Sequence, residues 1–176
     1  LREMGYAVTV YDRHDRAGGL LIYGIPGFKL EKDVVERRTR RLAEGGVEFR
    51  LGFEVGADAS LADLRAQHDS ILVATGVYAA RDLVVPGAGS QGVTPALDYL
   101  IASNRTGLGD HVPDFENGRL NAAGKSVVVV GGGDTAMDCV RTAVRQGATS
   151  VTCLYRRDRA NMPGSAREVS HAEEEG

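Results

Sequence analysis

A run of four valines that stops at a glycine-rich turn is the feature that most constrains the fold of this chain. An unbroken apolar run such as residues 127–130 is typical of a strand covered on both faces, as in a parallel sheet. The run ends at Gly131, and an apolar pattern with helical spacing follows at once. Gly131-x-Gly133-x-x-Ala136 is therefore a strand–turn–helix loop with small residues where the diphosphate of a dinucleotide needs them.

Each small residue of this loop has its own physical reason. Gly131 permits the tight turn, Gly133 lets phosphates approach the backbone, and Ala136 lets the helix pack closely on the strand. The start of the helix then offers free N–H groups and the positive end of its dipole to the phosphates. Asp134 has two interpretations, a nucleotide ligand or a cap for the amides of the first helical turn, and we expect the cap.

The residues at the end of the next strand indicate which nucleotide binds. An NAD-dependent enzyme usually has an acidic residue there, which holds the ribose 2′-hydroxyl. This chain has Arg156 and Arg157 instead, after a strand that begins near Val151. A guanidinium pair favours a 2′-phosphate, so the predicted ligand is NADP(H). The alternative interpretation is a solvated basic pair in a loop.

Length and charge restrict the classes of protein that remain. The 176 residues are enough for one or two small α/β domains, and a formal net charge of −3 gives no indication of a nucleic-acid partner. No apolar run reaches the roughly 18 residues that a membrane span needs, so we expect a cytoplasmic protein. Basic residues cluster once, on the expected solvated face of a helix, at Arg37, Arg38, Arg40 and Arg41.

Cysteine and histidine give no indication of a metal site or an acid–base catalyst. Cys139 and Cys153 form no C-x-x-C motif, and we expect both as small core residues rather than a disulfide or metal ligands. The histidines stand in polar stretches, where we expect surface positions for His14, His68, His111 and His171.

The first half of the chain contains the elements of another nucleotide-binding unit. A predicted strand over 6–12 ends in an acidic residue, as the second strand of a dinucleotide fold does when it holds a ribose. The pair Gly18 and Gly19 and an apolar loop over 20–27 follow, and then a helix over 31–44. The glycine pair also has a simpler interpretation as a turn, and the apolar loop as a hydrophobic plug.

The remaining pattern predicts alternating strands and helices. Residues 47–51 alternate as a half-buried strand, Ser60 opens a short helix with a capping box, and 69–75 predict a buried strand. A crossover over 93–123 contains one helical stretch, at 95–103. The helix after the valine strand is predicted to end at Gly147 and to bury Ala136, Val140, Ala143 and Val144.

Four segments together resemble the small chain of bacterial NADPH-dependent glutamate synthase. They also resemble the NADPH-side domains of dihydropyrimidine dehydrogenase and of NADH-dependent ferredoxin:NADP oxidoreductases, within the FAD/NAD(P)-binding oxidoreductases. The segments are residues 18–32, 73–77, 131–139 and 154–164. The choice of glutamate synthase rests on Tyr-Gly-Ile-Pro in the first segment and Arg-Ala-Asn-Met-Pro-Gly in the last.

The resemblance implies an α/β fold with two doubly wound, Rossmann-like dinucleotide-binding domains. Residues 1–92 would be a partial FAD-binding domain, 93–123 the crossover, and 124–176 a partial NADPH-binding domain. The first strand and glycine loop of the FAD domain are expected before residue 1, so we expect a fragment of a longer protein. Residues 1–5 fit this expectation as the tail of a helix with Gly5 as its cap.

The resemblance also implies two sets of cofactor-binding residues. Those expected to contact the FAD ribose, the adenine side, the adjoining loop or the phosphates are Asp12, Gly18, Gly19, Leu20, Lys29, Val55, Thr75 and Gly76. Those expected in the NADPH loop and at its 2′-phosphate are Gly131, Gly132, Gly133, Asp134, Thr135, Arg156 and Arg157. Tyr23 is a weaker suggestion for the flavin, against plain packing in a Gly/Pro loop.

The implied function is the input of electrons to a glutamate synthase. NADPH would give a hydride to FAD, and electrons would continue through [4Fe-4S] clusters, which this chain does not ligate, to a large subunit. That subunit would make L-glutamate from L-glutamine and 2-oxoglutarate. Hydride transfer between two bound cofactors requires no catalytic side chain. Two alternatives remain: the same chemistry with ferredoxin or a pyrimidine as acceptor, or a nucleotide-binding module without turnover.

Overall fold

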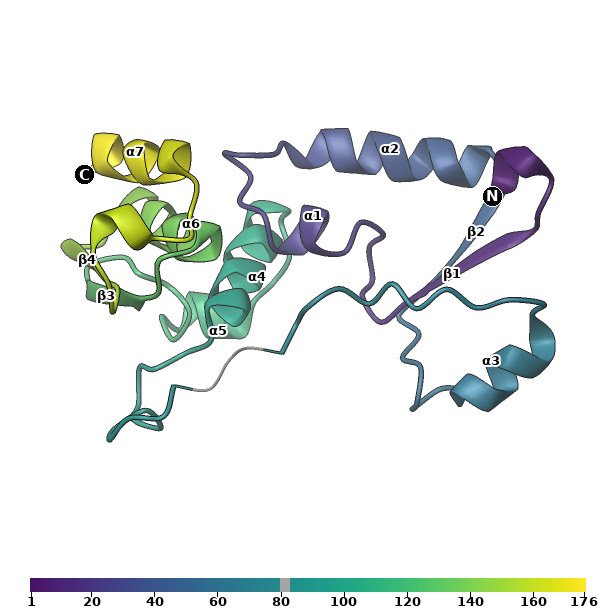
Figure 1. Cartoon of the computed structure of the whole chain (residues 1–176), viewed down its shortest axis with the longest axis horizontal. Helices are drawn as coiled ribbons and strands as arrows, with labels where there is room; N and C mark the ends of the chain where they lie inside the picture. The colour runs from purple at the N-terminus through teal and green to yellow at the C-terminus, as the bar shows by residue number, and fades with distance from the viewer. Residues whose placement is uncertain (80–82) are drawn as a thin grey trace. The chain divides into compact units, whose positions relative to one another are not determined.

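The computed structural model describes residues 1–79 and 83–176 and divides the chain into two compact units (Figure 1). The first unit contains residues 1–22 and 30–79. The second contains residues 23–29 and the rest of the chain up to Gly176. Each unit has one parallel two-stranded sheet, so the α/β class is confirmed.

The first unit is a strand–helix–strand arrangement followed by a short helix. Strand β1 (Val8–Asp12) pairs in parallel with β2 (Val47–Leu51), and the helix α2 (Lys32–Glu44) connects them. The register runs from Val8 opposite Val47 to Asp12 opposite Leu51. A 3₁₀ turn (η1, Arg2–Met4) precedes β1, and α3 (Leu61–Gln67) follows β2.

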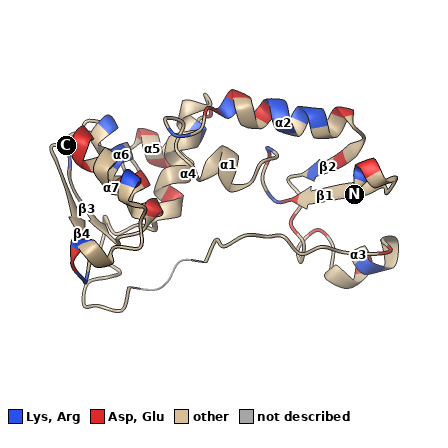
Figure 2. Ribbon diagram, turned by 45° about the horizontal axis from the view of Figure 1, so that its top comes forward, with Lys and Arg blue, Asp and Glu red and all other residues tan. Residues whose placement is uncertain are grey.

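Local signals set the ends of these elements as predicted. Gly5 caps η1 in the left-handed conformation, with φ 92°, and Ser60 forms the expected capping box with Asp63 at the start of α3. The basic cluster of α2 lies on its exposed side, where Figure 2 shows blue segments along the helix. The expected solvated face is therefore confirmed.

The second unit consists of helices gathered around its own pair of strands. Helices α4 (Ala96–Gly107) and α5 (Pro113–Glu116) precede β3 (Ser126–Val130), and α6 (Asp134–Arg145) leads to β4 (Ser150–Leu154). A 3₁₀ turn (η2, Arg159–Asn161) and α7 (Ala166–Glu175) complete it. The strands are parallel, with Ser126 opposite Ser150 and Val130 opposite Leu154.

The core of the second unit lies between α6, α7 and one face of the sheet. Ala136, Met137 and Val140 of α6 are buried with Val169 and Ala172 of α7. Half-buried side chains from both strands and from the segment before α7 pack against this cluster. Burial of a side chain such as Met137 stabilises the unit by about 1.5–3 kcal/mol.

The predicted strand over residues 69–75 is wrong. This stretch has neither helix nor strand, and Leu72 and Val73 are 81% and 69% exposed. A strand needs the backbone of a neighbour to pair with, and no strand of the described residues lies alongside. The apolar run predicted a buried strand because its residues are hydrophobic. Hydrophobicity alone does not indicate whether a neighbouring strand is present to pair with.

The expectation that the valine strand is covered on both faces is also wrong. Val127 and Val129 are half-buried, whereas Val128 and Val130 are 56% and 60% exposed. Successive side chains of a strand point to opposite faces, and the described residues cover one face of this sheet. For the same reason Cys153, expected in the core, is exposed in β4, although Cys139 of α6 is buried as predicted.

Two other elements differ from the expectation. Part of the predicted apolar loop is helical, as α1 (Leu20–Tyr23), and α4 continues four residues beyond the predicted end at residue 103, to Gly107. Ile22 and Tyr23 are fully buried, which supports the hydrophobic-plug interpretation of this stretch. Within the part of the chain that the structure describes, no helix has the length and apolar character needed to cross a bilayer.

Replacing Ser60 by Ala removes the side chain that caps the N-terminus of α3. The Ser60 hydroxyl accepts a hydrogen bond from the Asp63 N–H at 3.1 Å. Loss of such a cap costs about 0.5–2 kcal/mol. We therefore expect the amides of α3 to exchange hydrogen correspondingly faster in Ser60→Ala. Ser70→Ala, exposed and outside any helix, is the control. Equal exchange in the two variants would contradict the stabilising role of the cap.

Candidate functional site

The turn between β3 and α6 has the tight geometry that the sequence predicts. Gly131 lies at φ +152° and donates its N–H to the Leu154 carbonyl at 2.9 Å. A Cβ at this position would stand 3.3 Å from the Cβ of Ala136. The close packing of helix on strand therefore needs small residues at both positions.

The two following glycines differ in their surroundings. Gly132 is buried, and a Cβ there would lie 2.7 Å from the ring of Tyr155. Gly133 is the N-cap of α6, and the nearest atom to a Cβ there is Cγ of Pro163, at 4.0 Å. Gly132 is therefore a packing glycine, and the space over Gly133 is where a phosphate could approach the backbone.

The start of α6 fits an anion. The carbonyl of Gly133 already accepts the N–H groups of Ala136 and Met137. The N–H groups of Asp134 and Thr135 donate to no atom of the described residues. Unpaired N–H groups at the positive end of a twelve-residue helix are the arrangement that binds phosphate.

The expected cap by Asp134 is wrong. No side chain caps α6, because Gly133 occupies the N-cap and Asp134 is already the first helical residue. The carboxylate Oδ1 of Asp134 instead accepts the backbone N–H of Ser165 at 2.8 Å. Asp134 therefore ties the segment before α7 to the glycine loop.

That segment is the part of the site that sequence reasoning missed. The N–H of Gly164 donates to the Gly132 carbonyl at 2.9 Å, and a Cβ on Gly164 would come within 3.0 Å of the same oxygen. Ser165 caps α7 by accepting the Glu168 N–H. The glycine after Met162-Pro163 was a usable signal, since a glycine in a loop can mark a close backbone approach. The loop is thus supported on one side by its own chain.

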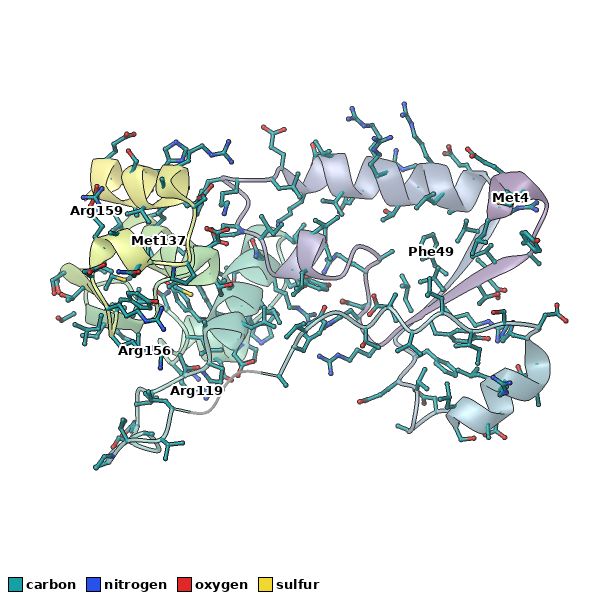
Figure 3. All side chains as sticks on the ribbon, viewed as in Figure 1. Met4, Phe49, Arg119, Met137, Arg156 and Arg159 are labelled. Atoms are coloured by element: carbon teal, nitrogen blue, oxygen red, sulfur yellow. The ribbon has the colours of Figure 1, made fainter. Side chains whose placement is uncertain are left out.

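The arginine pair follows β4 at the same edge of the sheet. Val130 is opposite Leu154 in the parallel sheet. The glycine loop and the residues after β4 therefore follow the carboxyl ends of two adjacent strands. Arg156 and Arg157 are exposed, and neither forms a hydrogen bond or ion pair within the described residues. By contrast, Arg159 binds Glu173 at 2.6 Å (Figure 3 labels Arg156 and Arg159). Both guanidiniums of the pair are therefore available to a ligand.

In the first unit, the predicted flavin residues begin at the end of β1. Asp12 ends the strand, and its Oδ1 accepts the N–H of His14 at 3.0 Å. Gly18 and Gly19 have φ of +127° and +54°, which favour glycine. A Cβ on Gly18 would lie 2.7 Å from Cγ1 of Val35. Both glycines are therefore favoured by backbone conformation, and Gly18 is also required by its packing on α2.

A residue outside the predicted set joins this group. The ring of Tyr78 lies 4.7 Å from the Arg13 guanidinium and 5.8 Å from the His14 ring. Burial raises the pKa of the Tyr78 phenol, and the charge of Asp12 raises it further. No local pattern in the sequence indicates that Tyr78 lies near the end of β1, because it is far from Asp12 along the chain and only the fold brings the two together.

The other predicted flavin residues are more dispersed. Thr75 and Gly76 lie in the exposed stretch without secondary structure, and Val55 is 45% exposed in a bridge with Ala59. Leu20 begins α1 and is half-buried. Lys29 belongs to the second unit, whereas Asp12 belongs to the first.

The aromatic and histidine expectations have mixed outcomes. Tyr23 is fully buried, with the Arg105 guanidinium 5.7 Å from its ring, which favours plain packing. Among the histidines His111 is exposed as expected, but His14, His68 and His171 are half-buried. His68, for example, lies 3.0 Å from the hydroxyl of Tyr11 in β1.

Comparison with known proteins identifies the family. The sequence matches the pyridine nucleotide-disulphide oxidoreductases over residues 1–175. The chain belongs to this family. It is 69% identical to the glutamate synthase [NADPH] small chain of Azospirillum brasilense and 68% identical to a putative glutamate synthase [NADPH] small chain of Cereibacter sphaeroides. Both alignments cover the whole chain but 36% and 42% of these relatives, so the chain spans well under half of their length. The expected homology to the small chain is confirmed.

The solved structures support the fold alone. Mycobacterium tuberculosis FprA in complex with NADPH matches with a TM-score of 0.76 and 20% sequence identity. The match covers 96% of this chain and 40% of FprA. The α/β arrangement described above is therefore shared with a protein of distant sequence.

Alanine at positions 132 and 133 distinguishes the two glycines of the loop. At Gly132 the added Cβ would meet the Tyr155 ring, so we expect a loss of about 1–3 kcal/mol in the free energy of unfolding. At Gly133 the space is open and φ is −93°, so Gly133→Ala should cost less, about 0.5–1 kcal/mol, which is the preference of an N-cap for glycine over alanine. Urea denaturation measures both variants. A similar loss in the two would show that Gly132 is not the packing glycine.

Proposed function

We propose that the chain carries the NADPH and FAD sites of the electron-input subunit of a glutamate synthase. When both cofactors are bound, NADPH supplies a hydride to FAD, and electrons pass through iron–sulfur clusters to a large subunit that makes L-glutamate from L-glutamine and 2-oxoglutarate. In this proposal the clusters have their ligands outside this chain. The small-chain names of two relatives that match the whole chain support the assignment.

One observation carries the NADPH site. The start of α6 has unpaired N–H groups, and the segment after β4 has two unpaired guanidiniums. Both lie at the same edge of one sheet. In our proposal the N–H groups of Asp134 and Thr135, with the open backbone at Gly133, hold the diphosphate. Arg156 and Arg157 hold the 2′-phosphate through charge-assisted hydrogen bonds. Gly131 and Gly132 shape the turn and let it pack on Tyr155.

The first unit is proposed to form part of the FAD site. Asp12, at the carboxyl end of β1, would accept hydrogen bonds from the ribose hydroxyls. The required glycines at 18 and 19 would leave the backbone accessible beside the cofactor. The remaining proposed contacts to FAD, by family resemblance, are Leu20, Val55, Thr75 and Gly76. We propose one Rossmann-like domain for each nucleotide, with residues 93–123, which lie in the second unit, as the crossover between them.

The work of these residues is binding and orientation rather than proton transfer. Hydride transfer needs two rings held at contact distance, and positioning of this kind supplies much of the rate. We propose no catalytic acid or base in this chain. Burial raises the pKa of Cys139 to about 12, so this thiol is protonated near neutral pH and is unsuited to act as a nucleophile.

A second candidate function differs only in the acceptor of the electrons. The putative oxidoreductase AegA of Escherichia coli is 50% identical over the whole chain, which is 27% of AegA's length. A closely similar module therefore occurs in a protein with another name. In this alternative, NADPH and FAD bind as above, and ferredoxin or a pyrimidine takes the electrons in place of the large subunit.

Replacing Arg156 and Arg157 by Ala tests the 2′-phosphate site. Each lost charge-assisted hydrogen bond should weaken NADP⁺ binding by about 1.5–3 kcal/mol and leave NAD⁺ binding unchanged. Calorimetric titration with both nucleotides measures the difference. Arg159→Ala is the control, because it removes the same charge nearby from a side chain already paired with Glu173. An NADP⁺ affinity that stays at the wild-type value would overturn this role.

Steady-state reduction of a dye tests the proposed reaction. The intact protein that contains this chain should carry about one flavin per polypeptide by its absorbance bands and should reduce the dye much faster with NADPH than with NADH. The 176-residue fragment alone is expected to be inactive, because it lacks the first strand and glycine loop of the FAD domain. Equal rates with both donors would contradict the 2′-phosphate site. Absence of flavin would favour a binding module without turnover. Co-purification of a glutamine-dependent large chain separates glutamate synthase from the alternative acceptors.

A further inference from the structure

A buried group of charges joins three distant segments of the second unit. The Lys29 ammonium lies 2.8 Å from Oδ1 of Asp138 in α6 and 3.2 Å from Oε2 of Glu168 in α7. The two carboxylate side chains are only 10% and 7% exposed, and that of Lys29 is 22% exposed. Arg141 adds a second cation, 3.1 Å from the same Glu168 oxygen.

The segment that carries Lys29 makes two further contacts within the second unit, a hydrogen bond and a cation–aromatic contact. The Asn104 side-chain amide donates to the Tyr23 carbonyl at 2.8 Å. The Phe28 ring lies 4.6 Å from the Arg141 guanidinium and 4.3 Å from that of Arg145. Residues 23–29 are therefore part of this unit by hydrogen bonding, aromatic contact and charge.

The charge group is one helical turn away from the proposed diphosphate site. Asp134 and Asp138 are four residues apart in α6 and so share a face of the helix. Glu168 lies in the first turn of α7, where its N–H donates to Ser165, and the Ser165 N–H donates to Asp134. A short chain of contacts thus leads from Lys29 to the glycine loop along both helices.

The pKa shifts agree with this geometry. Burial raises the pKa of Asp138, the Lys29 ammonium opposes the rise, and the charges of Glu168 and Asp134 add to it. Burial lowers the pKa of Lys29, but its hydrogen bonds and charge interactions with the two carboxylates outweigh burial and raise it. Without Lys29, the buried Asp138 carboxylate would lose its cation and Glu168 would keep only Arg141, beside a site for an anion.

We propose that Lys29 is a positioning residue for NADPH, which neutralises Asp138 and Glu168 and thereby holds α6 and α7 in the arrangement that the glycine loop requires. This inference rests on the proposed NADPH site. It assigns Lys29 to the second unit through its side chain, in place of the contact with FAD that family resemblance suggests. Two of the three hydrogen-bond donors of the ammonium are engaged by the carboxylates.

The test compares Lys29→Met with two variants that restore the balance of charge. Lys29→Arg keeps the cation, and Lys29→Met combined with Asp138→Asn removes one carboxylate together with the ammonium. NADP⁺ affinity by calorimetry and flavin content by absorbance are measured for each purified protein. Lys125→Met is the matched control, since the exposed Lys125 ammonium bonds the Gly118 carbonyl and no described carboxylate.

We expect Lys29→Met to weaken NADP⁺ binding by about tenfold or more with flavin content retained. Lys29→Arg and the double variant should recover most of the affinity, and Lys125→Met should bind as the wild type does. Recovery by the double variant separates loss of charge balance from simple loss of packing, because that variant lacks the lysine as well. If Lys29→Met does not fold, a folded double variant that binds NADP⁺ supports the proposal.

Three results would overturn it. The first is wild-type NADP⁺ affinity in Lys29→Met. The second is loss of flavin from that variant with unchanged NADP⁺ affinity, which would make Lys29 a ligand of FAD. The third is a double variant as impaired as the single one. A wild-type protein that fails to bind NADP⁺ would instead refute the proposed function, and this inference with it.

Discussion

The close approach of three stretches of backbone around Gly132 is the constraint on which the second unit depends. The buried glycine packs on the Tyr155 ring, its carbonyl accepts the Gly164 N–H, and Asp134 receives that of Ser165. These contacts fix the end of β4 and the start of α7 against the start of α6. As a result, the unpaired amides of α6 and the two guanidiniums after β4 lie at one edge of the sheet. In the sequence they are separated by the rest of α6 and by β4.

Sequence predicted the features that local physics determines. The strand formed by the valine run, the glycine turn, the helix that ends at Arg145, two residues before Gly147, and the capping box at Ser60 all depend on residues within a few positions of one another. Their signals are side-chain periodicity, backbone freedom and hydrogen bonds to neighbouring amides. The arginine pair belongs to the same class, because its position after a strand is visible without knowing the fold.

The features that sequence did not predict depend on distant partners. Residues 69–75 are apolar enough for a buried strand, but pairing requires a neighbour that no local pattern reveals. Asp134 binds a residue 31 positions away, and Lys29 binds one 109 positions away. A lysine in a Gly/Pro loop gave no indication that two buried carboxylates would surround it. Buried ion pairs of this kind matter chiefly through what happens when one partner is removed, since an isolated buried charge is strongly destabilising.

The membership of residues 23–29 in the second unit has a consequence for how the protein is made. Lys29 in this stretch is synthesised more than a hundred residues before its partners Asp138 in α6 and Glu168 in α7. Until α6 and α7 are synthesised, the Phe28 ring lacks its contacts with Arg141 and Arg145, and the Lys29 ammonium lacks both of its carboxylate partners. Nascent chains therefore expose this apolar stretch at least until α7 has been synthesised, which makes it a natural point for chaperone protection.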